Sequence, residues 1–192
     1  MKADPKRKGL LYAGTERGMF ISFNDGKKWQ QFQQNLPIVP ITDLTIKNNN
    51  LIAATQGRSL WIIDDLTPIH QLNKALMQQE VVLFKPQDAY RMGGGNGRTS
   101  RTAGTNQPGG AAFNFFIKKI GEKDPIALRV FDAKNQLVKT FSNQPNKDKK
   151  ESLLTVEEGN NIFYWNMMCE GAEKVKGMIL WWSSLNGPMA LP

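Results

Sequence analysis

The sequence predicts an all-β protein in which two blades of a partial β-propeller precede an incomplete β-sandwich. The first observation is an internal repeat: LLYAGTERGMFISFNDGKKW at 10–29 returns as NLIAATQGRSLWIIDDL at 50–66 when Tyr12 is laid on Ile52 without a gap. The second observation is a series of short apolar runs separated by Gly, Asn and Asp turns, which is typical of strands. A repeat spacing of roughly 40–50 residues is typical of propeller blades.

The first part of the chain reads as short paired strands. Residues 9–32 contain three of them, LLYAGT, GMFISF and KWQQF, and Asp25-Gly26 is a strong hairpin signal because glycine readily adopts positive φ. The alternating pattern over 41–47 predicts a fourth strand. LIAAT and SLWIID then form the second copy of the paired strands.

Beyond the repeat the composition changes. Thr67-Pro68 can open one or two helical turns, and VVLF at 81–84 predicts one more strand. We therefore assign residues 1–90 to two propeller blades with a short helical exit. Residues 91–110 are rich in glycine and predict a linker.

Residues 111–192 show a second β pattern. Its predicted strands are AAFNFFIKK, two strands within PIALRVFDAKNQLVKTFS, SLLTV and NIFYWNMM. Several short strands with turns at such intervals indicate a sandwich. A sandwich of six or seven strands would still lack its last ones, so we expect this module to be incomplete.

Bulk composition excludes several kinds of function. The net charge is +8 among 192 residues, but the basic residues are scattered without stacking aromatics, so we expect most of them to be solvated and no nucleic-acid partner. No apolar run approaches the length of a membrane span. Cys169 is the only cysteine and lies far from the only histidine, His70, so we expect no metal site, no catalytic thiol and no cofactor.

One turn of the first repeat carries a known motif. Ser22-Phe23-Asn24-Asp25-Gly26-Lys27-Lys28-Trp29 resembles the Asp-box of BNR-repeat β-propellers, Ser-x-Asp-x-Gly-x-Thr-Trp. Asn24 stands where the family has Asp, and Lys28 where it has Thr. In the family such boxes hold blade hairpins away from the catalytic face, so the resemblance implies a structural role for Ser22, Asn24, Gly26 and Trp29.

The resemblance extends over nearly the whole chain. Residues 7–66 look like the closing, last two blades of large bacterial BNR-repeat proteins, described as sortilin-like or glycosyl-hydrolase-like. ALRVFDAKNQLVKTF and EEGNNIFYWNM are similar to immunoglobulin-like and fibronectin type III-like modules. These likenesses imply a fragment of an extracytoplasmic protein that binds a carbohydrate or protein ligand, partners the remaining blades of its parent and catalyses nothing itself.

The alternative is a part of a sialidase- or xyloglucanase-like glycoside hydrolase whose catalytic residues lie mostly in other blades. Such enzymes need two carboxylates about 5–9.5 Å apart. Arg58, Asp43 and Asp64 are the candidates for a ligand-facing position. Arg58 can bind an anionic group or equally pair with Asp43 or Asp65, and Asp64 and Asp65 also suit caps of the turn before Pro68. No catalytic residue is assigned.

Overall fold

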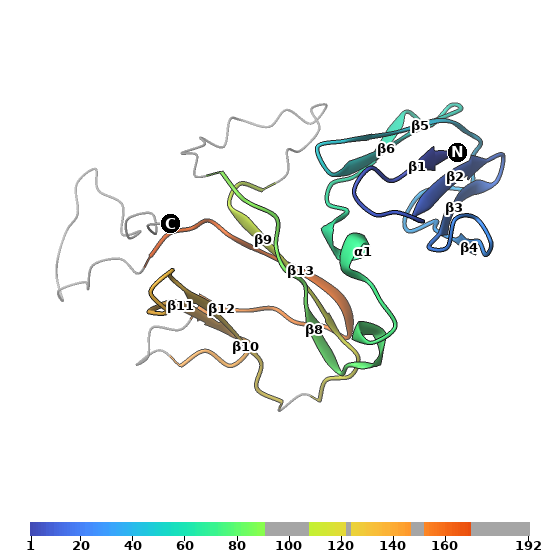
Figure 1. Cartoon of the computed structure of the whole chain (residues 1–192). Helices are drawn as coiled ribbons and strands as arrows, with labels where there is room; N and C mark the ends of the chain where they lie inside the picture. Colours follow the sequence, from blue (N-terminus) through green and yellow to red (C-terminus); the bar gives the residue numbers. More distant parts are fainter. Residues whose placement is uncertain (91–107, 122–123, 147–151, 170–192) are drawn as a thin grey trace, which may run out of the picture. The chain divides into compact units, whose positions relative to one another are not determined.

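The computed structural model describes residues 1–90, 108–121, 124–146 and 152–169, and these residues form mostly β-strands in four sheets (Figure 1). Within them there is little helix: α1 (Thr67–Gln71) and one 3-10 turn, η1 (Leu76–Gln78). The chain divides into two compact units, Met1–Asn73 and Lys74–Pro192. The prediction of an all-β protein is confirmed.

The first sheet of the first unit has four antiparallel strands in sequential order. They are β1 (Lys2–Ala3), β2 (Leu11–Thr15), β3 (Gly18–Ser22) and β4 (Gln30–Gln31). The three strands expected in residues 9–32 are present, with the third shorter than expected. Strand β1 was not expected, because two residues carry no alternating pattern.

The second sheet is a three-stranded antiparallel meander, followed by α1. Its strands are β5 (Ile41–Lys47), β6 (Asn50–Thr55) and β7 (Leu60–Ile63). Strand β5 has the predicted bounds, but it pairs with β6 and so opens the second sheet rather than completing the first. Helix α1 has Pro68 in its first turn, where the missing N–H of proline costs no helical bond.

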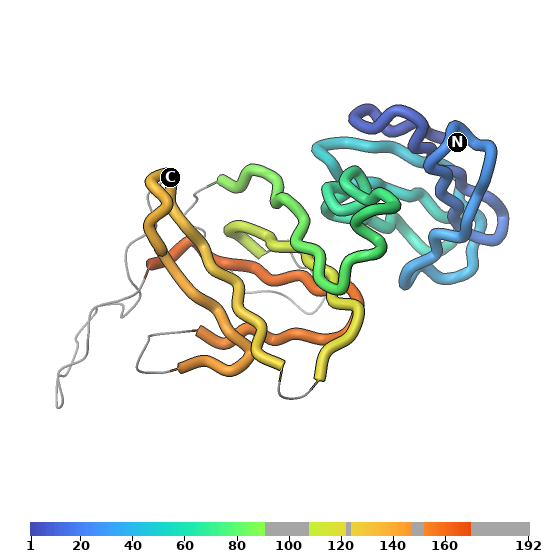
Figure 2. Tube along the Cα trace, turned by 60° about the horizontal axis from the view of Figure 1, so that its bottom comes forward, coloured from blue at the N-terminus to red at the C-terminus, as the bar shows by residue number. Residues whose placement is uncertain are grey.

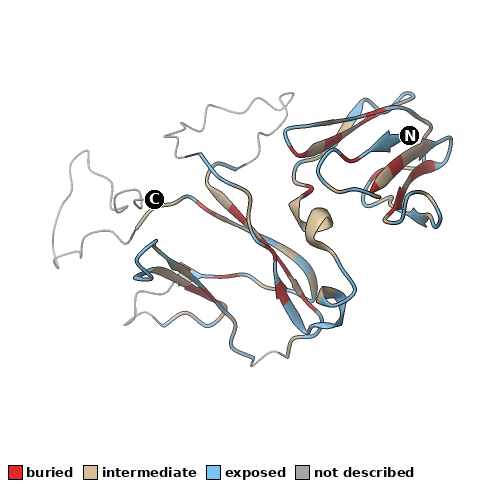
Figure 3. Cartoon of the chain, viewed as in Figure 1, coloured by how far each residue is buried: buried red, intermediate tan, exposed pale blue. Residues whose placement is uncertain are grey.

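The two sheets of the first unit share one hydrophobic core. It draws buried side chains from both sheets and from the connections around them: Leu10, Tyr12, Met19, Ile21, Leu36, Leu44, Leu51, Ala53 and Leu66. The close approach of β5 to β2 depends on Gly14, since a Cβ there would lie 2.5 Å from Cγ2 of Ile41. Buried residues lie on strands of both sheets in this unit (Figure 3).

The ungapped alignment of the two copies misplaces the first strand of the second copy by one residue, as burial shows. Tyr12 is fully buried, whereas Ile52 is only partly buried and its neighbours Leu51 and Ala53 face the core. Burial alternates along a strand, so a shift of one residue changes the face. The second strand keeps the expected phase: Ile21 is in the core, and Trp61, 40 positions later, packs against it. The two hairpins differ by one residue in length.

The second unit contains two further three-stranded sheets, which the tube in Figure 2 follows from strand to strand. One has the order β13-β9-β8, and the other β10-β11-β12 with β12 parallel to β11. Their bounds are β8 (Val81–Leu83), β9 (Ala111–Ile117), β10 (Ala127–Phe131), β11 (Leu137–Ser142), β12 (Ser152–Leu153) and β13 (Gly159–Trp165). Side chains from both sheets form one core around Phe115, Phe141 and Trp165.

The boundary between the units lies earlier than residues 91–110. Strand β8 pairs with β9, with Val82 opposite Phe116 and Leu83 opposite Phe115, so VVLF belongs with the second unit and not with the first. The pairing spans a long stretch of sequence that gives no local signal for it. Residues 91–107 of the expected linker lie outside the described part of the chain.

Candidate functional site

The turn between β3 and β4, at residues 22–29, is held by two side-chain oxygens. The buried Ser22 Oγ accepts the Gly26 N–H at 3.0 Å and donates to Asn24 Oδ1 at 3.0 Å. Asn24 Oδ1 also accepts the Lys28 N–H at 2.8 Å. The amide oxygen of Asn24 thus accepts two hydrogen bonds in this turn, and Lys28 contributes through its backbone.

Gly26 and Trp29 complete this turn. Gly26 has φ +82°, a left-handed conformation that favours glycine. A Cβ on Gly26 would lie 3.6 Å from the indole of Trp29, which therefore packs directly beside the turn. The Asp25 N–H donates to the Gly9 carbonyl at 3.0 Å and ties the turn to the segment before β2. All these contacts are internal to the hairpin or hold it to the sheet.

Arg58, Asp43 and Asp64 are all exposed, and the second sheet keeps them apart. Asp43 lies on β5 opposite Ala54 of β6, which is opposite Leu60. Asp64 follows Ile63, at the other end of β7, while Arg58 lies in the turn before that strand. Asp43 Oδ1 accepts the Leu44 N–H at 2.8 Å.

These positions do not make a pair of catalytic carboxylates. Asp43 lies across the sheet from Leu60, and Asp64 is four residues further along the chain, so the two are separated by about 13 Å along the strand direction. Two carboxylates of a glycosidase lie about 5–9.5 Å apart. Of the two residues expected to cap the turn, it is Asp65 whose Oδ1 accepts the Thr67 N–H, at 2.8 Å.

The structure shows a buried polar cluster that the sequence did not indicate. The side chain of Asp4 is fully buried, and its Oδ2 lies 2.8 Å from Nε2 of His70 on α1. The buried Tyr12 hydroxyl donates to the same oxygen at 3.3 Å. Asp4 Oδ1 accepts the N–H groups of Lys6 and Arg7 at 2.8 and 2.9 Å. One carboxylate thus joins the N-terminal segment, β2 and α1.

Arg7 belongs to the same connection. Its guanidinium donates to the carbonyl of Ile69 and lies 4.9 Å from the centre of the Phe23 ring. Arg7 is therefore an exception to the expectation that most of the basic residues are solvated. The available signal was Asp4-Pro5, since an aspartate before proline commonly opens a turn through its side chain.

The environment of the Asp4, Tyr12 and His70 cluster favours a charged Asp4 and a neutral Tyr12. Burial by itself would raise the pKa of Asp4, but the bonds from His70 and from the backbone amides outweigh it, so the pKa lies below its usual 3.8. Burial, and then the charge of Asp4, raises the pKa of Tyr12 well above its usual range. A carboxylate that engages one ring nitrogen orients a histidine, as in hydrolytic triads. In this cluster the other side chain bound to Asp4 is that of Tyr12, which is fully buried and cannot reach a substrate. We therefore assign the cluster a structural role.

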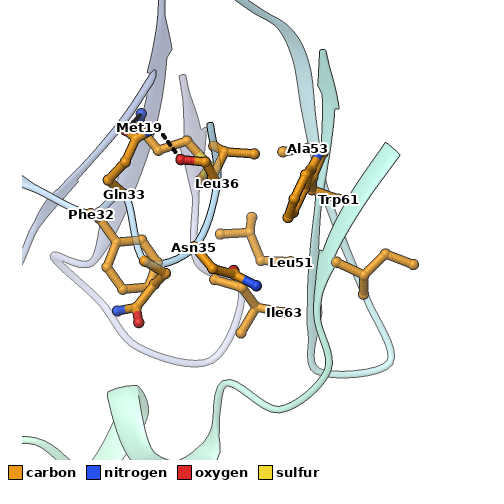
Figure 4. A pocket seen from close by; sticks show the side chains of 11 residues that line it. Met19, Phe32, Gln33, Asn35, Leu36, Leu51, Ala53, Trp61 and Ile63 are labelled. Atoms are coloured by element: carbon orange, nitrogen blue, oxygen red, sulfur yellow. Dashed lines mark hydrogen bonds between the residues drawn. The ribbon is translucent and has the colours of Figure 1, made fainter. Parts of the chain in front are cut away.

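A pocket in the first unit lies between the loop after β4 and the facing side of β6 and β7 (Figure 4). Its walls include Phe32, Leu51 and Trp61, and Gln33 Oε1 accepts the Met19 N–H beside it at 3.3 Å. The space open to the centre of a water molecule is about 30 Å³. A cavity of this size admits water rather than a sugar ring.

Metal and membrane sites can be assessed for the described residues alone. They contain no group of three or more His, Cys, Asp or Glu side chains placed to hold a metal ion. None of their helices has the length and apolar character required to cross a membrane. Trp181 and Trp182, for which the sequence favours core or edge packing over a sugar-stacking platform, lie outside the described part of the chain.

Comparison with known protein families, with curated proteins and with solved structures gives no match for this chain.

Proposed function

We propose that the chain is a non-catalytic, ligand-binding part of a BNR/Asp-box propeller protein that acts outside the cytoplasm. The observation that carries the proposal is the set of contacts in the turn of Ser22, Asn24, Gly26 and Trp29. Each of these residues performs the task that the motif requires, although positions 24 and 28 depart from the family pattern. The contacts of this turn therefore support the proposal.

The arrangement of the sheets supports the same proposal. Propeller blades are small antiparallel sheets that pack face to face, and the two sheets of the first unit share one core in this way. The remaining blades of the parent would be their further partners. In the second unit, two sheets around Phe141 and Trp165 support an immunoglobulin-like sandwich, since such modules pack two sheets over a common core.

Within the first unit, the ligand that fits best is a glycan or a protein bound at the surface rather than a small molecule held in the pocket beside Trp61. The pocket beside Trp61 is too small for a sugar ring. Arg58 stands exposed at the tip of the β6–β7 hairpin and can contact an anionic ligand. Asp43 and Asp64 lie too far apart to act together as glycosidase acids, so the hydrolase alternative receives no support from them.

The proposal is tested by titrating the 192-residue chain with sialyllactose and with xyloglucan oligosaccharide, by calorimetry and by assay of released reducing sugar. We expect no release of sugar. If sialyllactose binds, Arg58→Ala should weaken its binding about fivefold or more, whereas Arg17→Ala, at the tip of the other hairpin, should not. Binding of neither sugar would exclude these two glycans as the ligand. Hydrolysis that is lost in Asp43→Asn or Asp64→Asn would contradict the proposal.

A further inference from the structure

A hollow in the surface of the first unit lies at the hairpin between β3 and β4. Part of its lining is apolar: Ile21 belongs to the hydrophobic core, and the half-buried Phe23 packs against that core. The rest of its lining is polar and exposed, and consists of Asn24, Lys28 and Gln30. The space open to the centre of a water molecule is about 90 Å³, compared with about 30 Å³ in the pocket beside Trp61. A polar space of this size admits a carboxylate.

The polar side chains of this hollow have unused hydrogen-bonding groups. Asn24 Oδ1 accepts bonds from the Ser22 hydroxyl and from the Lys28 N–H, whereas its Nδ2 donates to no other described residue. These two bonds hold the amide group of Asn24 in one orientation, so its nitrogen is a preorganised donor. Within the described ranges, neither the Lys28 ammonium nor the Gln30 amide forms a hydrogen bond or an ion pair.

The charge around the hollow is positive. Lys28 lines it, and the guanidinium of Arg7 lies 4.9 Å from the centre of the Phe23 ring. The carboxylate of Asp25 does not line the hollow; it lies beside Gly9, where an added Cβ would be 3.6 Å from Asp25 Oδ2. An ammonium group and amide donors, with no carboxylate among the lining residues, form a set of donors that suits an anion.

We propose that this hollow binds the carboxylate of a uronic acid residue in an acidic polysaccharide. The Lys28 ammonium and the Asn24 amide nitrogen donate to the carboxylate, and the Gln30 amide binds a neighbouring hydroxyl of the sugar. The carbon-bound hydrogens of the ring lie against the apolar lining of Ile21 and Phe23. This inference rests on the proposed ligand-binding function, and it names the class of ligand and a place where that ligand binds.

The mixed lining favours an acidic sugar over an acidic peptide. A uronic acid carries its carboxylate directly on a ring that also bears hydroxyls and carbon-bound hydrogens. One rigid group can therefore reach the cation, the amides and the apolar lining together, which keeps the entropic cost of binding low. An acidic peptide presents its carboxylate on a flexible side chain and has no adjacent hydroxyl for Gln30.

The expected binding is weak and depends on salt. The polar groups of the hollow are exposed, and exposed charge pairs contribute modestly to affinity. We expect a dissociation constant on the order of 0.1–1 mM for a short uronic acid oligosaccharide at low ionic strength. Affinity should fall as salt is added, because counter-ions screen the attraction between the carboxylate and Lys28.

Titration of the full chain with trigalacturonate, followed through its backbone amide NMR signals, tests the proposal. Binding should shift the signals of residues 21–30 and reach saturation. The methyl-esterified trisaccharide keeps the rings but lacks the charges, and it should bind about tenfold or more weakly. A glutamate trimer that binds the same residues as tightly as trigalacturonate would assign the hollow to an acidic peptide and overturn the proposal.

Two substitutions in the hollow test the assigned donors. Lys28→Met removes the ammonium group and should weaken binding of trigalacturonate about fivefold. Asn24→Asp keeps the oxygen that accepts the bonds of the turn, but it replaces the amide donor with a second carboxylate oxygen. This variant should retain the amide spectrum of the parent outside residues 21–30, yet bind about tenfold or more weakly.

The matched control is Lys27→Met, which removes the same charge from an exposed neighbour that does not line the hollow. Its affinity should stay within about twofold of the parent value. Equal weakening by Lys27→Met and Lys28→Met, or full binding by Asn24→Asp, would overturn the proposal. So would weakening confined to Arg58→Ala, or no binding of trigalacturonate. These outcomes leave the proposed function in place, because that function is contradicted by hydrolysis and not by the loss of one ligand.

Discussion

Asp4 is a carboxylate that the fold places in the interior of the first unit, where an unpaired charge would be costly. It remains there because His70, Tyr12 and two backbone amides all bind it. A charged group is thereby used to join the N-terminal segment to α1 across 66 positions of sequence. The stability of this unit should depend on the ionisation of that one group.

The lowered pKa of Asp4 predicts how stability changes in acid. Because the folded pKa lies below the unfolded 3.8, the unfolded chain binds more protons near that pH, and stability rises with pH there. The contribution is fully present above pH 3.8 and is lost as pH falls through the folded pKa. Asp4→Asn should flatten this part of the profile, measured as the urea midpoint of the first unit between about pH 2 and 5 by hydrogen exchange.

The matched control for this prediction is Asp64→Asn, which neutralises an exposed carboxylate outside the buried cluster. It should leave the slope of the profile as it is in the parent chain.

At high pH the stability of the first unit should change in the opposite direction, because the raised pKa of Tyr12 keeps the hydroxyl neutral inside the fold. Stability should fall as pH rises above 10.0, the usual pKa of tyrosine, and Tyr12→Phe should lack that loss. For the acid range, equal slopes of stability against pH in Asp4→Asn and in the parent chain would contradict the conclusion that Asp4 is charged and bound in the fold.

The single elements were largely predictable because their signals are local. Alternation predicted β5 at 41–47, and Asp25-Gly26 located a tight turn. The phase of the repeat was wrong in the first strand because the two hairpins differ by one residue in length, and a shift of one residue moves a side chain to the other face. Strand β8 was assigned to the wrong neighbour for a related reason: its partner β9 follows after a long interval of sequence.

The close packing of strands β2 and β5 allows a prediction about these two elements. Gly14→Ala should destabilise the first unit by about 1–3 kcal/mol, because the added methyl group would lie 2.5 Å from Cγ2 of Ile41 and the sheets would have to separate. Gly109→Ala is the matched control, since nothing lies within 4 Å of its Cβ position and its φ is ordinary. Urea unfolding of both variants measures the difference. Equal midpoints would show that β5 can move away at no cost.

The candidate site, by contrast, was predictable only where it is local. Ser22, Asn24, Gly26 and Trp29 lie close together in sequence, and their contacts follow from the turn that the motif forms. Asp4 and His70 meet only because β1, β2 and α1 fold around one core, and no pattern in the sequence joins an N-terminal Asp-Pro to a distant histidine. Arg58 and Asp64 are exposed, and their role as ligand-facing residues stays a prediction.

At the scale of the whole molecule, the two hydrophobic cores are separate sets of residues. The first draws on positions between Leu10 and Ile69, and the second on positions between Ala111 and Cys169. Cooperative unfolding requires shared burial, and each core is built within its own compact unit. We therefore expect two unfolding transitions rather than one.

Truncation of one buried side chain in each core tests this expectation. Leu51→Ala should lower the stability of the first unit by about 2–5 kcal/mol, and Phe141→Ala that of the second by about 3–5 kcal/mol, because each leaves a cavity among its neighbours. Hydrogen exchange in increasing urea, resolved by peptide, reports β6 and β9 separately. Each substitution should move the midpoint of its own unit and leave the other in place, since the lost contacts lie on one side of Asn73. Parallel shifts of both midpoints in both variants would show instead that the units unfold as one body.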